Sequence, residues 1–265
     1  MVEQHVHNLS KREIYRKALA LRADGRLYDR TDAYLEDSFS TSIKRFTEVA
    51  FRLRGAKRIL DVGPGSCILV ALLSELGHIC HVVDLVEFKE KRAAMLKKHK
   101  VEFKLCNVEV DNLPYAEGFF DAVTCCQALE HFTHSHLKPV QEFYRVLRKG
   151  GIVEIDVPNV ACFRNRLRLL RGKHITWDYE KHYLRTEPVI YKGIMCYPDR
   201  HNREFTKNEL DLLIRSAGFV NVEVGFLKSS RYREGFKKFK SMGSAFRDIL
   251  PSTRKHLIAF GVKGT

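Results

Sequence analysis

The stretch from Arg58 to Cys67, which reads Arg-Ile-Leu-Asp-Val-Gly-Pro-Gly-Ser-Cys, constrains the fold of this chain more than any other. It predicts a hydrophobic strand that runs into a glycine turn and then into a helix. Gly63 and Gly65 allow backbone angles that a side chain would forbid, and they let a ligand approach the main chain closely. The helix expected over 68–76 offers unpaired N–H groups and a positive dipole end to a carboxylate or phosphate. The turn therefore indicates a nucleotide-cofactor site, without saying which cofactor.

From residue 58 onward, apolar runs rich in β-branched residues alternate with helical patterns. Such alternation is typical of parallel strands with helices on both faces, so we expect an α/β fold built on a doubly wound, Rossmann-like sheet. The expected strands are 58–62, 79–83, 101–105, 122–126, 152–157, 220–224 and 256–262. The expected helices are 68–76, 88–99, 137–147 and 206–217.

Two segments interrupt or precede this alternation. Residues 1–57 are expected to form an N-terminal helical cap, with a capping box at 10–13 and a second helix over 41–53. Residues 58–265 form the main domain. Within it, 160–205 is a long insertion that mixes basic and aromatic residues, and we expect it to form a lid over the substrate together with the cap.

The composition indicates a cellular compartment but leaves several classes of partner open. The chain has a formal net charge of +14 and a pI near 9.5, which suits RNA, an anionic membrane face or an anionic substrate. No apolar run reaches the ~18–20 residues of a membrane span, and we see no secretory signal. The seven cysteines include no Cys-x-x-Cys pair and no zinc-like spacing. We therefore expect reduced thiols, a cytoplasmic protein and no metal.

Further motifs follow the glycine turn. Asp84 ends the second strand about 20 residues later, where an acid can accept both hydroxyls of a ribose. Then come Asn-Val-Glu-Val-Asp-Asn-Leu-Pro at 107–114, Leu-Glu-His at 129–131 and Leu-Arg-Lys-Gly-Gly at 147–151. Over residues 55–160 the chain resembles the class I S-adenosylmethionine-dependent methyltransferases, and it is most similar to their type 11/12 small-molecule group.

This resemblance implies a seven-stranded sheet whose last strand, 256–262, is reversed. It also implies that S-adenosylmethionine is the cofactor and S-adenosylhomocysteine the product. The implied cofactor contacts are Asp61, Gly63, Gly65 and Ser66 at the methionine part, Asp84 and Leu85 at the ribose, Asn107 and Val108 at the adenine, and Gln127 at the methionine amino group or the substrate entrance.

Three positions depart from the family pattern. Cys67 stands where the third glycine of the turn is usual, Asn107 replaces an acidic residue, and Gln127 replaces a glutamate. The amide oxygen of Asn107 can still accept a hydrogen bond from the adenine amino group. An NAD enzyme, the alternative for such a turn, would carry the third glycine and lack the downstream elements.

A general base would assist an acceptor hydroxyl as it loses its proton. His131 is the first candidate, because it lies just beyond the fourth strand, on the side where such sheets bind ligands, and its neutral imidazole is available near pH 7. The alternative is that His131 only caps or packs on the next helix, and His174, His182 and His201 are rival candidates.

Substrate contacts are expected from the cap and the insertion. Arg164, Arg168 and Arg171 would pair with an anionic group of the substrate, or else form a solvated helix face. The residues expected to contact the substrate are Tyr28, Tyr34, Arg164, Arg168, His174, Tyr183, His201 and Arg203.

The segment 231–250 repeats apolar residues at helical spacing, with lysines and arginines between them. It would lie on an anionic membrane, or pack on its own domain between the last two strands. The leading interpretation of the whole chain is O-methylation of a small molecule, a sugar, or a glycolipid or secondary-metabolite intermediate. The alternatives are methylation of RNA, suggested by the charge, and a catalytically inactive cofactor-binding partner protein.

Overall fold

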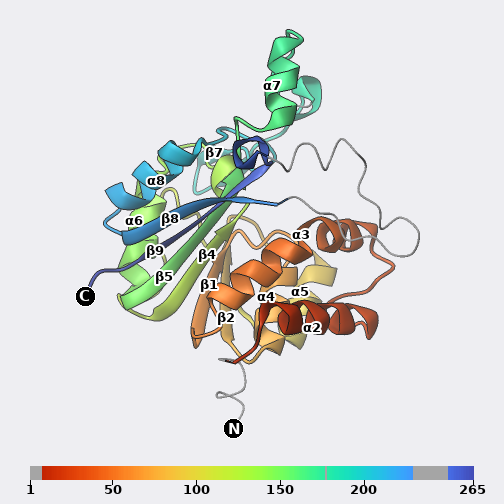
Figure 1. Ribbon diagram of the computed structural model, residues 1–265, viewed down its shortest axis with the longest axis vertical. Coiled ribbons are helices and arrows are strands. Elements are labelled where there is room, and N and C mark those ends of the chain that lie inside the picture. Colours follow the sequence, from red (N-terminus) through yellow and green to blue (C-terminus); the bar gives the residue numbers. More distant parts are fainter. Residues whose placement is uncertain (1–7, 177, 229–249) are drawn as a thin grey trace.

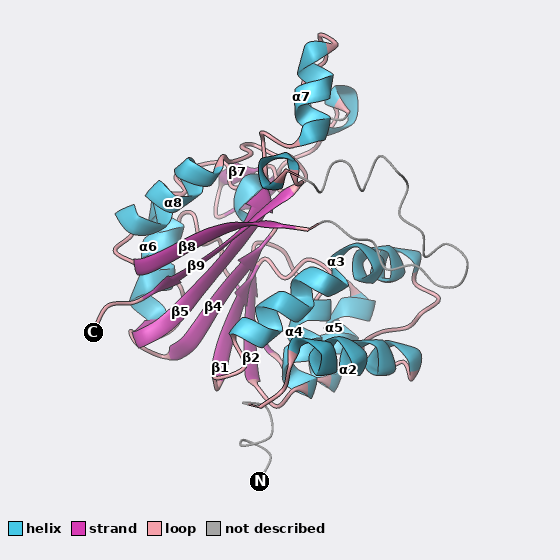
Figure 2. Ribbon diagram, viewed as in Figure 1, coloured by secondary structure: helices cyan, strands magenta, loops and turns pink. Residues whose placement is uncertain are grey.

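A computed structural model describes residues 8–176, 178–228 and 250–265 of the chain. Its centre is a seven-stranded sheet with helices packed on both faces (Figure 1). Helices α2 to α5 cover one face, and α6 and α8 cover the other (Figure 2). The predicted α/β fold is confirmed.

The strands follow the predicted alternation closely. They are β1 (Arg58–Val62), β2 (Ile79–Asp84), β3 (Glu102–Leu105), β4 (Phe120–Cys126), β5 (Leu147–Pro158), β8 (Val220–Leu227) and β9 (His256–Val262). Their order across the sheet is β3-β2-β1-β4-β5-β9-β8. Strands β1 to β5 pair in parallel, whereas β9 runs antiparallel to both neighbours, β5 and β8. The predicted doubly wound sheet with a reversed last strand is therefore confirmed.

Two hydrophobic cores hold the helices against the sheet. The helices are α2 (Lys11–Ala23), α3 (Ala33–Arg52), α4 (Ile68–Glu75), α5 (Glu90–Lys98), α6 (Leu137–Val146), α7 (Phe163–Leu170) and α8 (Lys207–Ser216). One core joins α2 to α5 to their face of the sheet, with Phe39 and Leu72 fully buried in it. The other joins α6 and α8 to the opposite face through Phe143 and Leu210. The predicted cap thus shares its core with α4.

The second N-terminal helix begins earlier than the sequence pattern predicts. The expectation was a start at residue 41, but α3 begins at Ala33. The side chain of Asp32 accepts hydrogen bonds from the N–H groups of Tyr34 and Leu35, which is the arrangement of a helix N-cap. The first helix, α2, has the predicted capping box between Ser10 and Glu13.

The insertion at 160–205 has secondary structure of its own. It contains α7, a π-helical turn (Glu180–Leu184) and a two-stranded hairpin of β6 (Val189–Tyr191) and β7 (Ile194–Cys196). Helix α7 stands away from the sheet (Figure 1). The hairpin reaches back to the main domain, because Lys192 Nζ lies 2.7 Å from a carboxylate oxygen of Asp111.

Residues 231–249 of the predicted basic segment lie outside the described residues. Within the ranges that the structure does describe, no helix combines the length and apolar character needed to cross a bilayer.

Asp121, at the start of β4, joins two strands and suggests a first prediction. Its Oδ2 accepts the N–H groups of Lys57 and Arg58 at 2.9 and 2.7 Å, and its Oδ1 accepts from Arg148 Nε at 2.5 Å. Replacement by alanine leaves these donors unsatisfied, so Asp121→Ala should lower the free energy of unfolding by about 1–3 kcal/mol. Urea denaturation at pH 7 measures this.

The matched control for Asp121 is Asp211→Ala, which removes an exposed i,i+4 pair with Arg215 on α8. That change should cost no more than about 0.5 kcal/mol. Burial opposes ionisation of Asp121, but the hydrogen bonds from Arg148 and the two N–H groups outweigh it and lower its pKa. A lowered pKa stabilises the fold above the unfolded pKa, so the penalty of Asp121→Ala should shrink as the pH falls. Equal penalties for the two variants at pH 7 would contradict this account.

Candidate functional site

The two glycines of the turn after β1 serve different purposes. Gly63 has φ of +64°, and a Cβ built on it would lie 2.7 Å from the Cβ of Ala128. Gly65 has φ of +51°, and a Cβ there would meet nothing within 4 Å. Gly63 is therefore required by close packing against the segment after β4, whereas Gly65 borders open space where a ligand can approach the backbone.

Cys67 keeps the backbone shape that the missing third glycine would have. Its φ is +59°, in the left-handed region, and its side chain is fully buried. Its N–H donates to the Pro64 carbonyl at 2.8 Å, which closes the turn. No side chain caps the start of α4. The first N–H groups of α4 are thus available to an anionic part of a ligand.

Two carboxyl groups lie at the ends of β1 and β2. Asp61 is buried and accepts a hydrogen bond from Thr124 Oγ1 at 2.7 Å. Burial raises the pKa of Asp61 to about 7. Burial also raises the pKa of Asp84, although its carboxylate accepts a hydrogen bond from the Val86 N–H at 3.3 Å. A cationic or hydroxyl-bearing ligand would therefore lower the free energy of the ionised carboxylates.

The predicted adenine side of the site meets the insertion. Asn107 is buried, and its Oδ1 already accepts a hydrogen bond from the Glu109 N–H at 3.0 Å. Its Nδ2 lies 3.2 Å from Cys196 Sγ in β7. The oxygen has a second lone pair, so the predicted contact with an adenine amino group stays chemically open. Val108 follows it and is also buried.

Gln127, just after β4, is held by the end of β5. It has φ of +52°, and its Nε2 donates to Asp156 Oδ1 at 2.6 Å. The same oxygen accepts from Arg45 Nη1 of α3 at 3.0 Å. Sequence reasoning missed Arg45, because nothing in a helical pattern reveals an ion pair to a residue 111 positions away.

Arg92 on α5 is a second residue that the sequence did not single out. Its Nη1 donates to the carbonyl of Gly65 at 2.8 Å, so the guanidinium lies against the cofactor turn. Its charge also acts on Tyr34 and Asp84. Tyr34, a predicted substrate residue, lies exposed at the start of α3 and is not among the residues that line the cavities described below.

Five of the predicted catalytic and substrate residues meet at one cavity. Its volume is about 940 Å³. The cavity lies beyond β4, between the short 3-10 helix at Leu129–His131 and the insertion. The predicted residues that line it are His131, His174, Tyr183, His201 and Arg203, and the other lining residues include Tyr179, His182, Asp199 and Glu204.

A second cavity, of about 750 Å³, lies between α3 and the strands β8 and β9. Gln127 lines it, together with the basic residues Lys44, Arg45, Arg52 and Lys228. The first cavity is the better candidate for the acceptor, because it alone of the two contains His131 and the predicted substrate residues of the insertion.

Three predicted substrate residues are placed elsewhere. Tyr28 is buried, its ring lies 6.0 Å from that of Phe39, and its hydroxyl donates to Glu36. Arg164 donates to the side-chain oxygen of Asn165. Arg168 donates to the carbonyls of His174 and Thr176, so it supports the cavity wall instead of facing a substrate. None of the three lines the cavity, because each side chain is used in packing or local hydrogen bonds.

His131 is held in one orientation. Its Nδ1 lies 2.9 Å from the Arg200 carbonyl, which fixes that nitrogen as the donor and leaves Nε2 with a lone pair. Burial, and then the nearby His201, lower the pKa of His131 to about 4. The imidazole is therefore neutral at pH 7, but it is a weak base.

Comparison with known proteins finds methyltransferases. A family model described as a methyltransferase domain matches residues 60–155. The chain is 27% identical over 213 residues to a ubiquinone/menaquinone biosynthesis C-methyltransferase UbiE of Pseudomonas fluorescens, covering 74% of this chain and 77% of the relative. It is 25% identical over 179 residues to a demethylmenaquinone methyltransferase of Mycolicibacterium vanbaalenii, covering 66% and 71%.

Solved structures share the fold. The 1,6-didemethyltoxoflavin-N1-methyltransferase of Burkholderia thailandensis, determined with S-adenosylhomocysteine bound, has a TM-score of 0.53 at 19% identity and covers 95% of this chain and 87% of its own. A putative methyltransferase from Bacillus halodurans has a TM-score of 0.52 at 16% identity, covering 83% and 98%.

The two glycines of the turn give a matched pair of variants. Gly63→Ala should destabilise the protein by more than about 2 kcal/mol, because the new methyl group would overlap Ala128. Gly65→Ala should cost about 1–2 kcal/mol for its left-handed backbone, but should weaken S-adenosylhomocysteine binding, because its methyl enters the ligand space. Urea denaturation and calorimetric titration separate the two effects. Unchanged S-adenosylhomocysteine affinity in Gly65→Ala would refute the expectation that the ligand lies against this turn.

Asp61→Asn tests the buried carboxyl. The raised pKa means that the folded state favours the protonated acid, so stability is lost as the pH rises from the unfolded value of 3.8 toward about 7. The amide keeps an oxygen for Thr124, so the variant should be on the order of 1–2 kcal/mol more stable than the parent at pH 8, and no more stable near pH 4. It should also bind S-adenosylmethionine more weakly. Equal stability of the two proteins at pH 8 would contradict the raised pKa.

Proposed function

Because this chain belongs to the class I S-adenosylmethionine-dependent methyltransferases, we propose that it transfers the methyl group to a hydroxyl oxygen of a small acceptor bound in the cavity beside His131. The acceptor would be a sugar, a glycolipid intermediate or a secondary metabolite. The single observation that carries this proposal is the convergence of His131, His174, Tyr183, His201 and Arg203 on one cavity beyond β4.

The residues around the cofactor turn fit a methyl donor of this kind. When bound, S-adenosylmethionine supplies an electrophilic methyl carbon on a sulfonium sulfur. The acidic groups Asp61 and Asp84 would face its cationic and hydroxyl parts, and the open backbone at Gly65 would admit it. In the transfer, the acceptor oxygen would form a bond to the methyl carbon as the carbon–sulfur bond breaks and S-adenosylhomocysteine leaves, and the hydroxyl proton would pass to water.

Positioning is the main contribution expected of the protein. The Nε2 of His131 can accept a hydrogen bond from the acceptor hydroxyl and orient its lone pair, which contributes more than proton removal by a base whose pKa is about 4. Tyr179 and Tyr183 stack at 5.7 Å between ring centroids and line the same cavity. Their flat faces would pack against a ring of the acceptor.

The identity of the accepting atom has one specific competitor. The curated relatives include enzymes named for C-methylation in quinone biosynthesis, so an activated ring carbon is the second candidate. RNA is the third candidate acceptor, because the chain has a formal net charge of +14. Contact with an anionic membrane through 231–250 remains a prediction.

Transfer of a labelled methyl group from S-adenosylmethionine into fractionated cell extract tests the acceptor class. We expect label in the glycan or small-metabolite fraction, attached to oxygen when the product is analysed by NMR. With the purified acceptor, His131→Ala should lower kcat by about 100-fold, with S-adenosylhomocysteine affinity retained.

The matched control is His134→Ala, which removes an exposed histidine three positions away that pairs with Glu109. This variant should keep the parental kcat. Label in RNA, or on carbon, would overturn the proposed O-methylation. Normal turnover by His131→Ala would remove His131 from the transfer step.

A further inference from the structure

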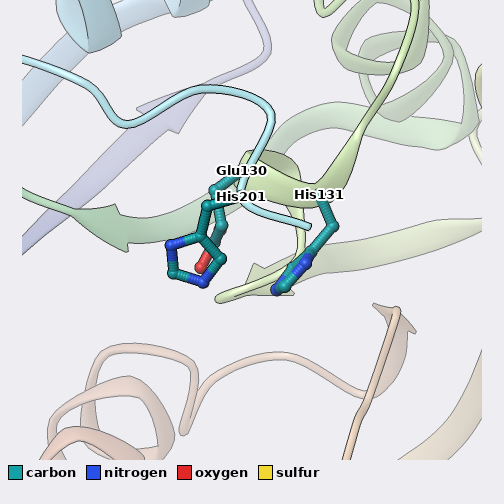
Figure 3. Close-up of side chains that lie close together, drawn as sticks. All are labelled: Glu130, His131 and His201. Atoms are coloured by element: carbon teal, nitrogen blue, oxygen red, sulfur yellow. The ribbon is translucent and has the colours of Figure 1, made fainter. Parts of the chain in front are cut away.

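Glu130, His131 and His201 form a compact cluster, and the two histidines line the acceptor cavity. Each side chain offers one oxygen or nitrogen atom, and these three atoms all lie within 4.8 Å of one another. Figure 3 shows the three side chains lying close together, with the Glu130 carboxylate partly hidden by the His201 ring. The three residues come from two segments, the short helix after β4 and the end of the insertion. The separation is close enough that small side-chain rotations would place all three around one ion.

Each of the two histidines has an oxygen acceptor at its Nδ1. His131 Nδ1 lies 2.9 Å from the Arg200 carbonyl, and His201 Nδ1 lies 3.4 Å from Glu204 Oε1. Oxygen acceptors at Nδ1 place the proton there and the lone pair on Nε2. Histidines that bind metals usually have this arrangement, in which an outer oxygen fixes the tautomer and orients the ring.

Glu130 supplies an independent sign that a ligand is missing. Its side chain is 1% exposed, and its Oε2 has no hydrogen-bond partner among the described residues. A buried carboxylate needs a proton or a cation to offset its desolvation. The described side chains of the cluster itself do not provide one.

The backbone holds the cluster together without an ion. The Asn202 N–H donates to the Glu130 carbonyl at 2.7 Å, and Asn202 Nδ2 donates to the His131 carbonyl at 2.8 Å. These bonds fasten the insertion to the helix that carries the other two side chains. The backbone therefore fixes the relative positions of the three side chains.

A second group of the same kind shows the contrast. Cys126, Glu154 and Asp156 also bring potential ligand atoms within 4.8 Å of one another. There, however, Arg45 lies 3.0 Å from Asp156 and already supplies a positive charge. The thiol of Cys126 donates to Glu154 at 3.1 Å. That cluster therefore differs in having a cation at hydrogen-bond distance, although Glu154 Oε1 and Asp156 Oδ2 also have no hydrogen-bond partner among the described residues.

We propose that Glu130, His131 and His201 bind one divalent transition-metal ion, of the class of Zn²⁺ or Mn²⁺, at the edge of the acceptor cavity. Two imidazole nitrogens and one carboxylate oxygen suit such ions, and three protein ligands leave coordination positions for water or an acceptor oxygen. This last role rests on the proposed function: a hydroxyl bound to the ion would lose its proton more easily. His131 would then act as a metal ligand instead of a proton acceptor.

Metal binding can be measured without any methyl acceptor. The full-length protein is stripped with a chelator and titrated with Zn²⁺ and Mn²⁺ by calorimetry, and with Co²⁺ by visible absorption. We expect saturable binding of one ion per chain and Co²⁺ bands typical of nitrogen and oxygen ligands. Glu130→Gln, His131→Ala and His201→Ala should each weaken binding by about tenfold or more.

The matched control is His182→Ala, which removes a histidine that lines the same cavity but lies outside the cluster. It should keep the parental metal affinity. S-adenosylhomocysteine binding by each variant shows that the fold is intact. Absence of saturable binding in the parent, or unchanged affinity in His201→Ala with the fold intact, would overturn the site.

Turnover measurements distinguish metal binding itself from a role of the bound ion in methyl transfer. If chelation lowers methyl transfer and the added ion restores it, the role at the acceptor is supported. If the ion binds but chelation leaves turnover unchanged, that role is refuted. Failure to find any methyl acceptor would count against the proposed function and leave the binding result standing.

Discussion

Parallel pairing of β1 with one strand on each side is the constraint on which the rest of the site depends. Asp61 lies opposite Val82 of β2 and Thr124 of β4 in the two ladders. This register places the Thr124 hydroxyl within 2.7 Å of the Asp61 carboxylate. The ladder continues into the turn, where the Gly63 N–H donates to the Val83 carbonyl at 2.9 Å. The carboxyl ends of the strands therefore meet at one edge with their polar groups already ordered.

That edge has an electrostatic character opposite to the chain as a whole. The formal net charge is +14, yet buried carboxyl groups gather at the ends of β1, β4 and β5: Asp61, Glu130, Glu154 and Asp156. Among the described side chains around Asp156, Arg45 is the one cation that reaches it at hydrogen-bond distance. An edge with more buried acid than compensating base favours a cationic ligand. A sulfonium cofactor would meet that demand near Asp61, and a metal ion would meet it at Glu130.

The sequence predicted most where one local pattern determines the structure. Strands β1 and β9 begin and end at the predicted residues, because their apolar runs are bounded by turn residues. Helix α3 began eight residues early, because Asp32 caps it in a stretch that reads as polar loop. The pairing of Arg92 with Gly65 could not be predicted, since no periodicity encodes contacts between side chains and distant backbone. Tyr28 failed as a substrate residue for the same reason: its burial against Phe39 depends on the packing of two helices.

The insertion, which we predicted to form a lid over the substrate, contacts the main domain at both ends of the site. Its hairpin bonds to Asp111 through Lys192 and contacts Asn107 through Cys196 at the expected adenine end. Its last residues bond to Glu130 and His131 at the acceptor end through Asn202. One continuous segment therefore contacts residues at both the expected cofactor site and the proposed acceptor site. Any shift of the hairpin that accompanies cofactor binding would be felt at His201, since both lie on the same short stretch of chain.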